Sequence, residues 1–400
     1  MTTFTASAET RTEPSASAWM MLLLAFACGL IAANLYYAQP LAGPIGVALG
    51  LSPGATGLIV TLTQIGYGIG LLFIVPLGDL LETRRLVLIL IGLAILSLLA
   101  AALSTHPLPF FAATLCIGLA SVAVQVLVPY AAHLVPEAER GRAVGSVVSG
   151  LMLGIMLARP VSSFIAQFAS WHTVFFISAA AMALLALMLR LALPRREPVS
   201  TISYGRLLAS MVDLMRNTPV LRRRAFYQAC MFAAFSLFWT TTPLLLAGPE
   251  FRLSQGGIAL FALAGVAGAI ASPIAGRFAD RGWTRAATAF AMLAVAGAFL
   301  ITHIGAYGSP LALGLLVAAG ILLDFGATTN LVLGQRAIFV LGAEYRSRLN
   351  GLYMATFFAG GALGSALGGL AYAHGGWATA SWLGFALPVA ALLYFFTEPK

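Results

Sequence analysis

Twelve apolar runs of roughly 20 residues recur along this chain of 400 residues, and they constrain its fold more than any motif does. A helix of about 20 residues is long enough to cross the hydrocarbon core of a bilayer. Because lipid offers no hydrogen-bond partners to the backbone, a spanning segment defaults to a helix. The sequence therefore predicts an all-α membrane protein with twelve transmembrane helices. The predicted spans are 18–39, 55–78, 86–104, 108–134, 143–168, 171–193, 225–247, 256–278, 286–303, 310–335, 351–372 and 377–397.

Composition supports a membrane protein and argues against other classes. Hydrophobic residues make up 60% of the chain and charged residues 9%, whereas a soluble domain carries about 25% charged residues. The three cysteines lie inside predicted spans, so no disulfide framework is indicated. The histidines have no metal-ligand spacing, and neither a catalytic triad nor a phosphate-binding loop is present. We therefore expect no enzyme, no metal site and no cofactor.

The arginines predict how the chain is oriented. It has 21 arginines and one lysine, and 20 of these 22 residues lie on one side of the predicted membrane. Only Arg252 lies on the opposite side, and Arg159 falls inside a span. Positive residues gather on the cytoplasmic side of membrane proteins. This bias predicts an inner-membrane protein with both termini in the cytoplasm, and it explains the net charge of +9 without nucleic acid.

The spans divide into two related halves. "LSPGATGLI" at 51–59 is similar to "LSQGGIALF" at 253–261, and "GDLLETRR" at 78–85 is similar to "GRFADRGWTR" at 276–285. Trp171 and Trp377 each open the last span of a half. Matches in the same order at similar offsets indicate a duplication. The predicted organisation is a disordered cytoplasmic tail (1–17), a six-helix half (18–193), a basic cytoplasmic linker (194–224) and a second six-helix half (225–400).

Polar and small residues sort among the spans with a period of three. Spans 1, 4, 7 and 10 carry most of the polar residues, and spans 2, 5, 8 and 11 carry small residues four positions apart. Polar groups in lipid are tolerated when they face protein or water, and small residues let helices approach closely. We expect the first set to line a central cavity, the second to form the contact between the halves, and the other spans to face lipid. Chance sorting is the alternative, because glycine is frequent in membrane helices.

The loop after the second span of each half carries the most specific motif. The second half has Gly276, Asp280, Arg281 and Arg285. The first half has Gly78, Glu82, Arg84 and Arg85, but its motif is two residues shorter. With this motif, twelve spans, a duplication and a basic central loop, the whole chain resembles the major facilitator superfamily, where the motif reads approximately Gly-x-x-x-Asp-Arg-x-Gly-Arg-Arg.

The resemblance implies two pseudo-symmetric halves and a conformational latch formed by these eight residues at the cytoplasmic helix ends. A basic topology signal on a tight turn is the alternative interpretation of the motif. Two features depart from the antiporters of the family. The fourth span has no buried arginine, with Thr114 near that place, and the fifth has Arg159 before Pro160, with serines where paired glycines are usual.

One acid, Asp324, lies about midway along the tenth span. An ionised aspartate at the bilayer centre costs about 2.5–3.5 kcal/mol on insertion scales. Removal from water favours the protonated form, so the carboxyl could take up and release a proton as its surroundings change. We expect Asp324 to couple transport to protons. Substrate contact without proton transfer and a permanent ion pair are the alternatives.

Arg159 is the only arginine deep in the predicted membrane, and we expect it to interact with Asp324 in at least one conformation. Its alternative is to extend its side chain toward the outer face. Further polar residues of the spans are candidate substrate contacts, although each could instead form an interhelical hydrogen bond of ~1 kcal/mol. The complete candidate binding set is Asn34, Tyr37, Gln64, Gln125, Tyr130, Arg159, Trp239 and Asn330.

These features predict a secondary active transporter that works by alternating access. Similarity to the drug- and metabolite-efflux branch of the family implies export of a small organic solute, driven by inward proton flow. A proton-coupled importer and a passive facilitator remain alternatives. The expected partners are a small-molecule substrate, protons and the lipid bilayer, and the expected state is a monomer.

Overall fold

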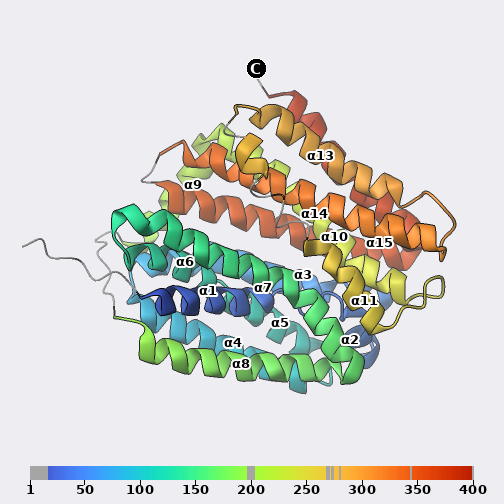
Figure 1. Cartoon of the computed structure of the whole chain (residues 1–400), viewed down its shortest axis with the longest axis horizontal. Coiled ribbons are helices and arrows are strands. Elements are labelled where there is room, and N and C mark those ends of the chain that lie inside the picture. The colour runs from blue at the N-terminus through green and yellow to red at the C-terminus, as the bar shows by residue number, and fades with distance from the viewer. Residues whose placement is uncertain are drawn as a thin grey trace, which may run out of the picture.

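The computed structural model describes residues 17–195, 203–266, 271, 274–278, 281–342 and 345–398, and the helices of this part form two groups that lie side by side (Figure 1). Within the described residues, nine helices are long and apolar enough to cross a membrane, and two shorter apolar helices accompany them. The predicted tail 1–17, except for Ser17, and the linker segment 196–202 lie outside the described residues. The domain boundaries therefore stay predictions.

The first group contains the elements up to residue 192, drawn from blue to light green in Figure 1. Its helices are α1 (Ala18–Ala33), α2 (Ala42–Ala48), α3 (Leu58–Phe73), α4 (Thr83–Leu103), α5 (Pro107–Ser121), α6 (Ala123–His133), α7 (Arg140–Phe168) and α8 (Trp171–Ala192). Its short 3-10 turns are η1 (Pro53–Ala55), η2 (Val75–Asp79) and η3 (Glu137–Glu139).

The second group follows a short helix, α9 (Tyr204–Asn217), which lies at one end of the molecule in Figure 1. Its elements are α10 (Pro219–Ala247), α11 (Gln255–Ala262), η4 (Leu263–Val266), α13 (Thr284–Ile301), α14 (Pro310–Phe339) and α15 (Arg346–Phe396). Helix α15 contains both the eleventh and the twelfth span. It breaks at Gly375 and Gly376, where the φ of Gly376 is 61°, a conformation that glycine adopts without steric cost. Trp377 follows this break directly, as the duplication predicts.

The first span differs from its prediction. The sequence predicts a helix over 18–39, but α1 ends at Ala33 and residues 34–41 form turns. Pro40 disfavours a helical conformation at the preceding residue, Gln39, and Asn34 caps the helix. The polar residues that follow Ala33 therefore sit on an irregular segment, with Tyr36 and Gln39 both buried.

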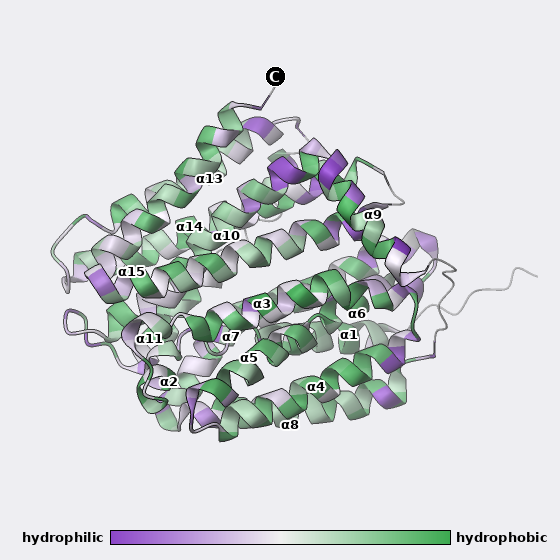
Figure 2. Ribbon diagram, turned by 180° about the vertical axis from the view of Figure 1, so that it is seen from behind, coloured by the Kyte–Doolittle hydropathy of each residue, from purple (hydrophilic) through white to green (hydrophobic). Residues whose placement is uncertain are grey.

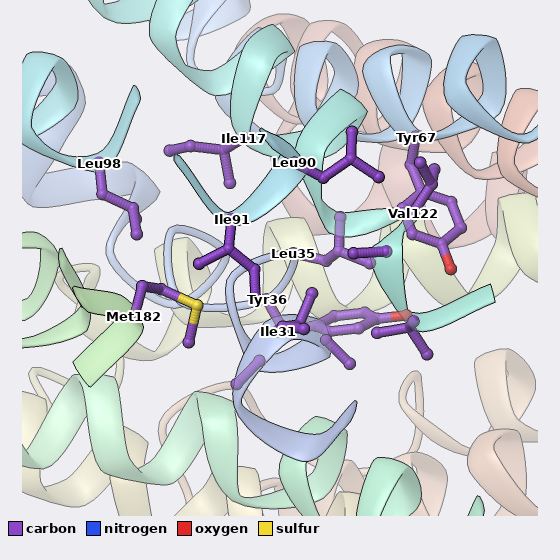
Figure 3. Packing of buried hydrophobic residues seen from close by; sticks show 14 of the residues in the cluster. Ile31, Leu35, Tyr36, Tyr67, Leu90, Ile91, Leu98, Ile117, Val122 and Met182 are labelled. Atoms are coloured by element: carbon purple, nitrogen blue, oxygen red, sulfur yellow. The ribbon is translucent and has the colours of Figure 1, made fainter. Parts of the chain in front are cut away.

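An apolar cluster holds the first group together (Figure 3). It joins the end of α1 to α3, α4, α5 and α8, and all of its side chains are buried. The cluster members labelled in Figure 3 are Ile31, Leu35, Tyr36, Tyr67, Leu90, Ile91, Leu98, Ile117, Val122 and Met182. Helix α10 of the second group is central: 83% of its most apolar stretch is buried. Helix α8 of the first group is outer, with 39% of its most apolar stretch buried. This fits a central seventh span and an outer sixth span.

The glycines spaced four residues apart in spans 2, 5 and 11 pack within a half, so these glycines do not make the contact between the halves that is predicted for their spans. A Cβ added at Gly29 of α1 would lie 2.7 Å from the carbonyl oxygen of Gly150 on α7. Gly66 approaches Leu115 on α5, and Gly364 approaches Ala233 on α10. The four-residue spacing predicted a close helix contact but could not show which neighbour makes it. Of the small residues expected in span 8, Gly268 and Ser272 lie outside the described residues.

The spans expected to join the halves nevertheless do so, through other residues. Helix α3 packs against α15 across the halves. The hydroxyls of Thr61 and Ser365 lie 2.7 Å apart, and Thr61 also donates to the carbonyl oxygen of Ala362 at 3.2 Å. A Cβ added at Gly369 would lie 2.9 Å from the Cα of Gly57. We call these contacts of Gly57, Thr61, Ser365 and Gly369 the α3–α15 seam.

Another contact between the halves joins α7 to α11. The Gln167 side chain accepts a hydrogen bond of 2.8 Å from the backbone N–H of Gly256, at the end of α7 and the start of α11. Both this contact and the α3–α15 seam lie toward the end of the molecule opposite α9 (Figure 1). Hydrophilic residues gather at the α9 end, while the lengths of the helices are hydrophobic (Figure 2). The chain is a multi-pass membrane protein.

Candidate functional site

Asp324 lies on α14 and is buried, with 3% of its surface exposed. Its Oδ1 atom accepts a hydrogen bond of 3.1 Å from the indole Nε1–H of Trp239 on α10. Its Oδ2 atom is also buried and has no hydrogen-bond partner among the described residues. Burying a carboxylate oxygen without a hydrogen bond is costly. A proton or a ligand that bound Oδ2 would remove this cost.

Arg159 lies on α7, directly before Pro160, and is as buried as Asp324. Its Nε–H donates to Oε1 of Gln39 at 2.7 Å, while its Nη2 atom has no partner among the described residues. The side chain therefore does not extend to the membrane surface. Its guanidinium carbon lies about 5 Å from three ring centroids, at 5.0 Å from Tyr36, 5.1 Å from Phe235 and 4.7 Å from Trp239.

The two buried charges come from opposite halves and border the same space. A Cβ added at Gly265 would lie 2.9 Å from Oδ2 of Asp324 and 3.5 Å from Nη1 of Arg159. It would also lie 3.3 Å from the Trp239 ring. Within the described residues the two charged side chains do not form a direct ion pair. We call Gln39, Arg159, Trp239, Gly265 and Asp324 the central site.

The other predicted binding residues lie at different places. Gln64 joins the halves through a hydrogen bond of 2.8 Å from its Nε2 to the hydroxyl of Ser236. Asn330 donates to Oε1 of Gln228 at 2.6 Å, within the second half. The oxygen of Asn34 accepts a hydrogen bond of 2.5 Å from Ser178. Of the predicted set, Arg159 and Trp239 lie beside Asp324, and Gln64 also reaches across the halves.

The remaining three candidates contact their own half. Gln125 donates to the Tyr67 hydroxyl at 3.0 Å, and Tyr130 donates to the carbonyl oxygen of Pro194 at 2.9 Å. Tyr37 is half-buried and lines an apolar groove of about 350 Å³ between α1 and α7. The role of all these residues in binding stays a prediction.

Two residues of the central site, Gln39 and Gly265, and the neighbouring Phe235 were absent from the predicted site residues. Gln39 was recognisable as a polar residue of the first span, but its contact with Arg159 depends on the turn after Ala33. Gly265 and Phe235 carried no distinguishing signal, because glycine and phenylalanine are common throughout the chain.

In the first half, the predicted latch residues make contacts that stay within that half. The Glu82 carboxylate caps α4 by accepting from the backbone N–H groups of Arg84 at 3.1 Å and Arg85 at 3.0 Å. The Arg84 side chain donates to the carbonyl oxygen of Leu193 at 3.1 Å. A Cβ added at Gly78 would lie 3.6 Å from Val126.

In the second half, Asp280 lies outside the described residues. Arg285 donates to the carbonyl oxygen of Glu398 at 3.2 Å, and the guanidinium of Arg281 lies 5.8 Å from the ring centroid of Trp283. A Cβ added at Gly276 would lie 3.4 Å from Nη2 of Arg336. The latch therefore stays a prediction for both halves.

Two bundles of membrane helices that meet around a shared polar centre define a secondary transporter rather than an enzyme. The chain belongs to the Major Facilitator Superfamily, whose family profile matches residues 21–338. It is 39% identical over 374 residues to YgaY, an uncharacterized transporter of Escherichia coli O157:H7, covering 94% of both chains.

More distant proteins share the same architecture. A chloramphenicol efflux pump of Mycobacterium tuberculosis is 26% identical over 297 residues, which cover 72% of this chain and 70% of the pump. The crystal structure of a mutant of the nucleoside transporter NupG has a TM-score of 0.75 at 17% identity, and the match covers 95% of this chain and all of NupG. At that identity, the likeness concerns the fold alone.

Proposed function

We propose that this transporter exports a small organic solute in exchange for protons and that Asp324 carries the coupling proton. The observation that supports this most is the buried Oδ2 atom of Asp324, which lacks a hydrogen-bond partner among the described residues. An ionisable side chain inside a membrane protein marks a proton or substrate pathway more often than a structural contact.

The position of Asp324 suits alternating access. In transporters built from two repeats, the substrate site lies near the bilayer midplane where the repeats meet, and rocking of the halves changes its access. Asp324 and Trp239 belong to the second half, whereas Arg159 and Gln39 belong to the first. Motion of one half against the other would therefore change the surroundings of the Asp324 carboxyl and the balance between its two protonation states.

Export is the direction we favour. The mycobacterial relative at 26% identity is named as an efflux pump, and the resemblance in the sequence is to the efflux branch of the family. A proton-coupled importer would use the same carboxyl with the substrate moving in the opposite direction. A passive facilitator would need Asp324 for binding but not for energy coupling.

The proposed orientation places both termini in the cytoplasm of an inner-membrane protein that acts as a monomer. The arginine distribution supports this orientation, as does the concentration of hydrophilic residues at the α9 end (Figure 2). In this orientation the α3–α15 seam closes the side opposite the cytoplasm. The latch residues near the cytoplasmic helix ends would then form contacts between the halves in another conformation.

Energised inverted membrane vesicles test the proposal. A screen of overexpressing cells for resistance to toxic compounds first supplies a substrate. Addition of that substrate should release protons from the vesicle lumen through the wild-type protein, and Asp324→Asn should abolish the release. Glu398→Gln, an acid-to-amide change at the chain's end, should leave it intact. If Asp324→Asn still concentrates substrate against a gradient, Asp324 is not the coupling residue.

A further inference from the structure

The unpaired atoms of the central site have complementary chemistry. Arg159 Nη2 and Gln39 Nε2 are buried hydrogen-bond donors without partners, and Asp324 Oδ2 is a buried acceptor without one, all judged among the described residues. Because these groups are 1–3% exposed, leaving each of them unsatisfied destabilises the folded protein. A ligand that satisfied all three would need a hydrogen-bond acceptor at one end and a donor at the other.

The arrangement of the donors favours a carboxylate as the acceptor. Oε1 of Gln39 accepts from Nε of Arg159 at 2.7 Å, which holds the Gln39 amide beside the guanidinium. The guanidinium fork and the adjacent amide N–H group thus form a cationic donor cluster. Guanidinium groups match the planar geometry of carboxylates and bind them with paired hydrogen bonds.

The other side of the site suits an ammonium group. Asp324 Oδ2 offers a carboxylate oxygen, and the Trp239 indole fixes the second oxygen through its hydrogen bond of 3.1 Å. Gly265 borders both sides, since a Cβ there would lie 2.9 Å from Asp324 Oδ2 and 3.5 Å from Arg159 Nη1. The two sides are therefore close enough for one small molecule to contact both.

We infer that the central site binds a small zwitterion of the amino-acid type, with its carboxylate on Arg159 and Gln39 and its ammonium on Asp324. This inference rests on the proposed function and names the substrate class of the same site. Arg159 and Asp324 together carry no net charge, and a zwitterion adds none. A substrate with a single charge would leave the buried site charged, which is strongly unfavourable away from water.

The inference also explains how export could be coupled. A protonated Asp324 carboxyl cannot accept a charged hydrogen bond from an ammonium group as a carboxylate can. The proton and the substrate ammonium therefore compete for Oδ2, which is the requirement for exchange of one against the other. Arg159 and Tyr36 are the described ionisable groups that interact electrostatically with Asp324, and neither replaces it as the proton acceptor.

A carboxylate substrate without an ammonium group would behave differently. It would leave the site neutral only when Asp324 is protonated, so that proton and substrate would bind together and move in the same direction. The charge of the substrate thus separates exchange from cotransport at this site.

Ligand-induced thermal stabilisation of the purified full chain tests the inference. The proteinogenic amino acids are screened first, and the best one is compared with its amide, its deaminated acid and its deaminated amide. For leucine these are leucinamide, isocaproate and isocaproamide. The wild-type protein should bind the zwitterion at least about tenfold more tightly than each analogue, because each analogue leaves a buried group unpaired.

Two variants should exchange these preferences. Asp324→Asn leaves Arg159 as the remaining charge, so it should bind isocaproate more tightly than leucine while still rejecting leucinamide. Arg159→Gln leaves Asp324 as the remaining charge, so it should bind leucinamide more tightly than leucine while rejecting isocaproate. Arg159→Lys, which keeps the charge, should retain the wild-type order with weaker binding and serves if the glutamine variant fails to fold.

The inference is overturned if no amino acid stabilises the wild-type protein, or if a singly charged or neutral analogue binds as tightly as the zwitterion. Such a result leaves the proposed function standing as long as Asp324→Asn abolishes proton release with the substrate from the resistance screen. If Asp324→Asn loses its preference for the zwitterion but still releases protons as the wild-type protein does, the proposed function is contradicted instead.

Discussion

Helix α14 carries two buried polar contacts to α10 that differ in kind. Asn330 donates to Gln228 at 2.6 Å, and Gln228 donates in turn to the carbonyl oxygen of Ala327 at 3.5 Å. These amides are neutral and belong to one half. Asp324 accepts a hydrogen bond of 3.1 Å from Trp239, but it carries a charge when ionised. It also lies near Arg159 of the other half and keeps one oxygen without a hydrogen-bond partner among the described residues. The first contact fastens two helices, whereas the second leaves bonding capacity for a proton or a substrate.

The difference shows that polarity inside a membrane protein is an incomplete guide to function. A buried group that has found its partner within a rigid half can be explained by packing alone. A buried group that borders both halves and remains unsatisfied needs another explanation.

Replacement of Arg159 should have the largest combined effect on transport and stability. Arg159→Gln leaves the Asp324 carboxyl buried without a cation nearby. Because the two groups are not in direct contact, the loss should stay below the ~3–5 kcal/mol of a broken buried ion pair. Thermal unfolding of the purified protein should show this loss, and Asp324→Asn in the same chain should recover part of it without recovering transport. Additive destabilisation by the two changes would contradict electrostatic coupling between them.

Cross-linking of the α3–α15 seam should stop transport reversibly. The hydroxyls of Thr61 and Ser365 lie 2.7 Å apart, so cysteines at these positions in a chain without Cys28, Cys116 and Cys230 should form a disulfide. Oxidation should abolish transport by holding the halves together, and reduction should restore it. The central site spans the halves and would be immobilised, whereas the Asn330 contact would not be affected. Thr61→Cys alone is the control, and full activity of the cross-linked protein would refute alternating access at this seam.

A methyl group at Gly265 should weaken binding at the central site. Gly265→Ala places a carbon 2.9 Å from Asp324 Oδ2, within the space assigned to the substrate. We expect about a tenfold loss of substrate affinity, the usual scale for about 1.4 kcal/mol, with thermal stability little changed. Gly314→Ala is the matched control, because a Cβ there would meet nothing within 4 Å. Unchanged affinity in Gly265→Ala would remove this space from the site.

Disruption of the amide contact should have the smallest effect. Asn330→Ala removes one interhelical hydrogen bond of a kind that contributes about 1 kcal/mol in membrane proteins. Thermal unfolding should show a loss of that size, while proton release in vesicles should stay within a few-fold of the wild-type rate. Complete loss of coupling in this variant would show that both contacts on α14 are functional and would break the comparison.

The fold could be predicted from the sequence because lipid leaves the backbone few choices. The twelve apolar runs, the duplicated loops around Gly78 and Gly276, and the tryptophans that open the last spans are all local signals, and the arrangement that they predict is present. The glycines spaced four residues apart contact their own half, whereas other residues of the same spans join the halves. A spacing of four residues indicates close approach on one face of a helix, but the identity of the approaching helix depends on the tertiary structure.

The candidate site was predictable in part. Asp324 and Arg159 stand out in the sequence as the acid and the arginine deepest in the spans. The contact of Arg159 with Gln39 required the chain to leave the helix at Ala33, and the approach of Gly265 required η4 to pack against α14. Such contacts between distant segments have no periodicity that could reveal them.

The central claim is that the Asp324 carboxyl converts a proton gradient into substrate movement. The most direct test reconstitutes the wild-type protein and Asp324→Asn in liposomes and measures substrate accumulation under an imposed pH gradient, together with exchange of labelled for unlabelled substrate without a gradient. We predict that the asparagine variant loses accumulation against the gradient. Accumulation by Asp324→Asn equal to that of the wild-type protein would contradict the account.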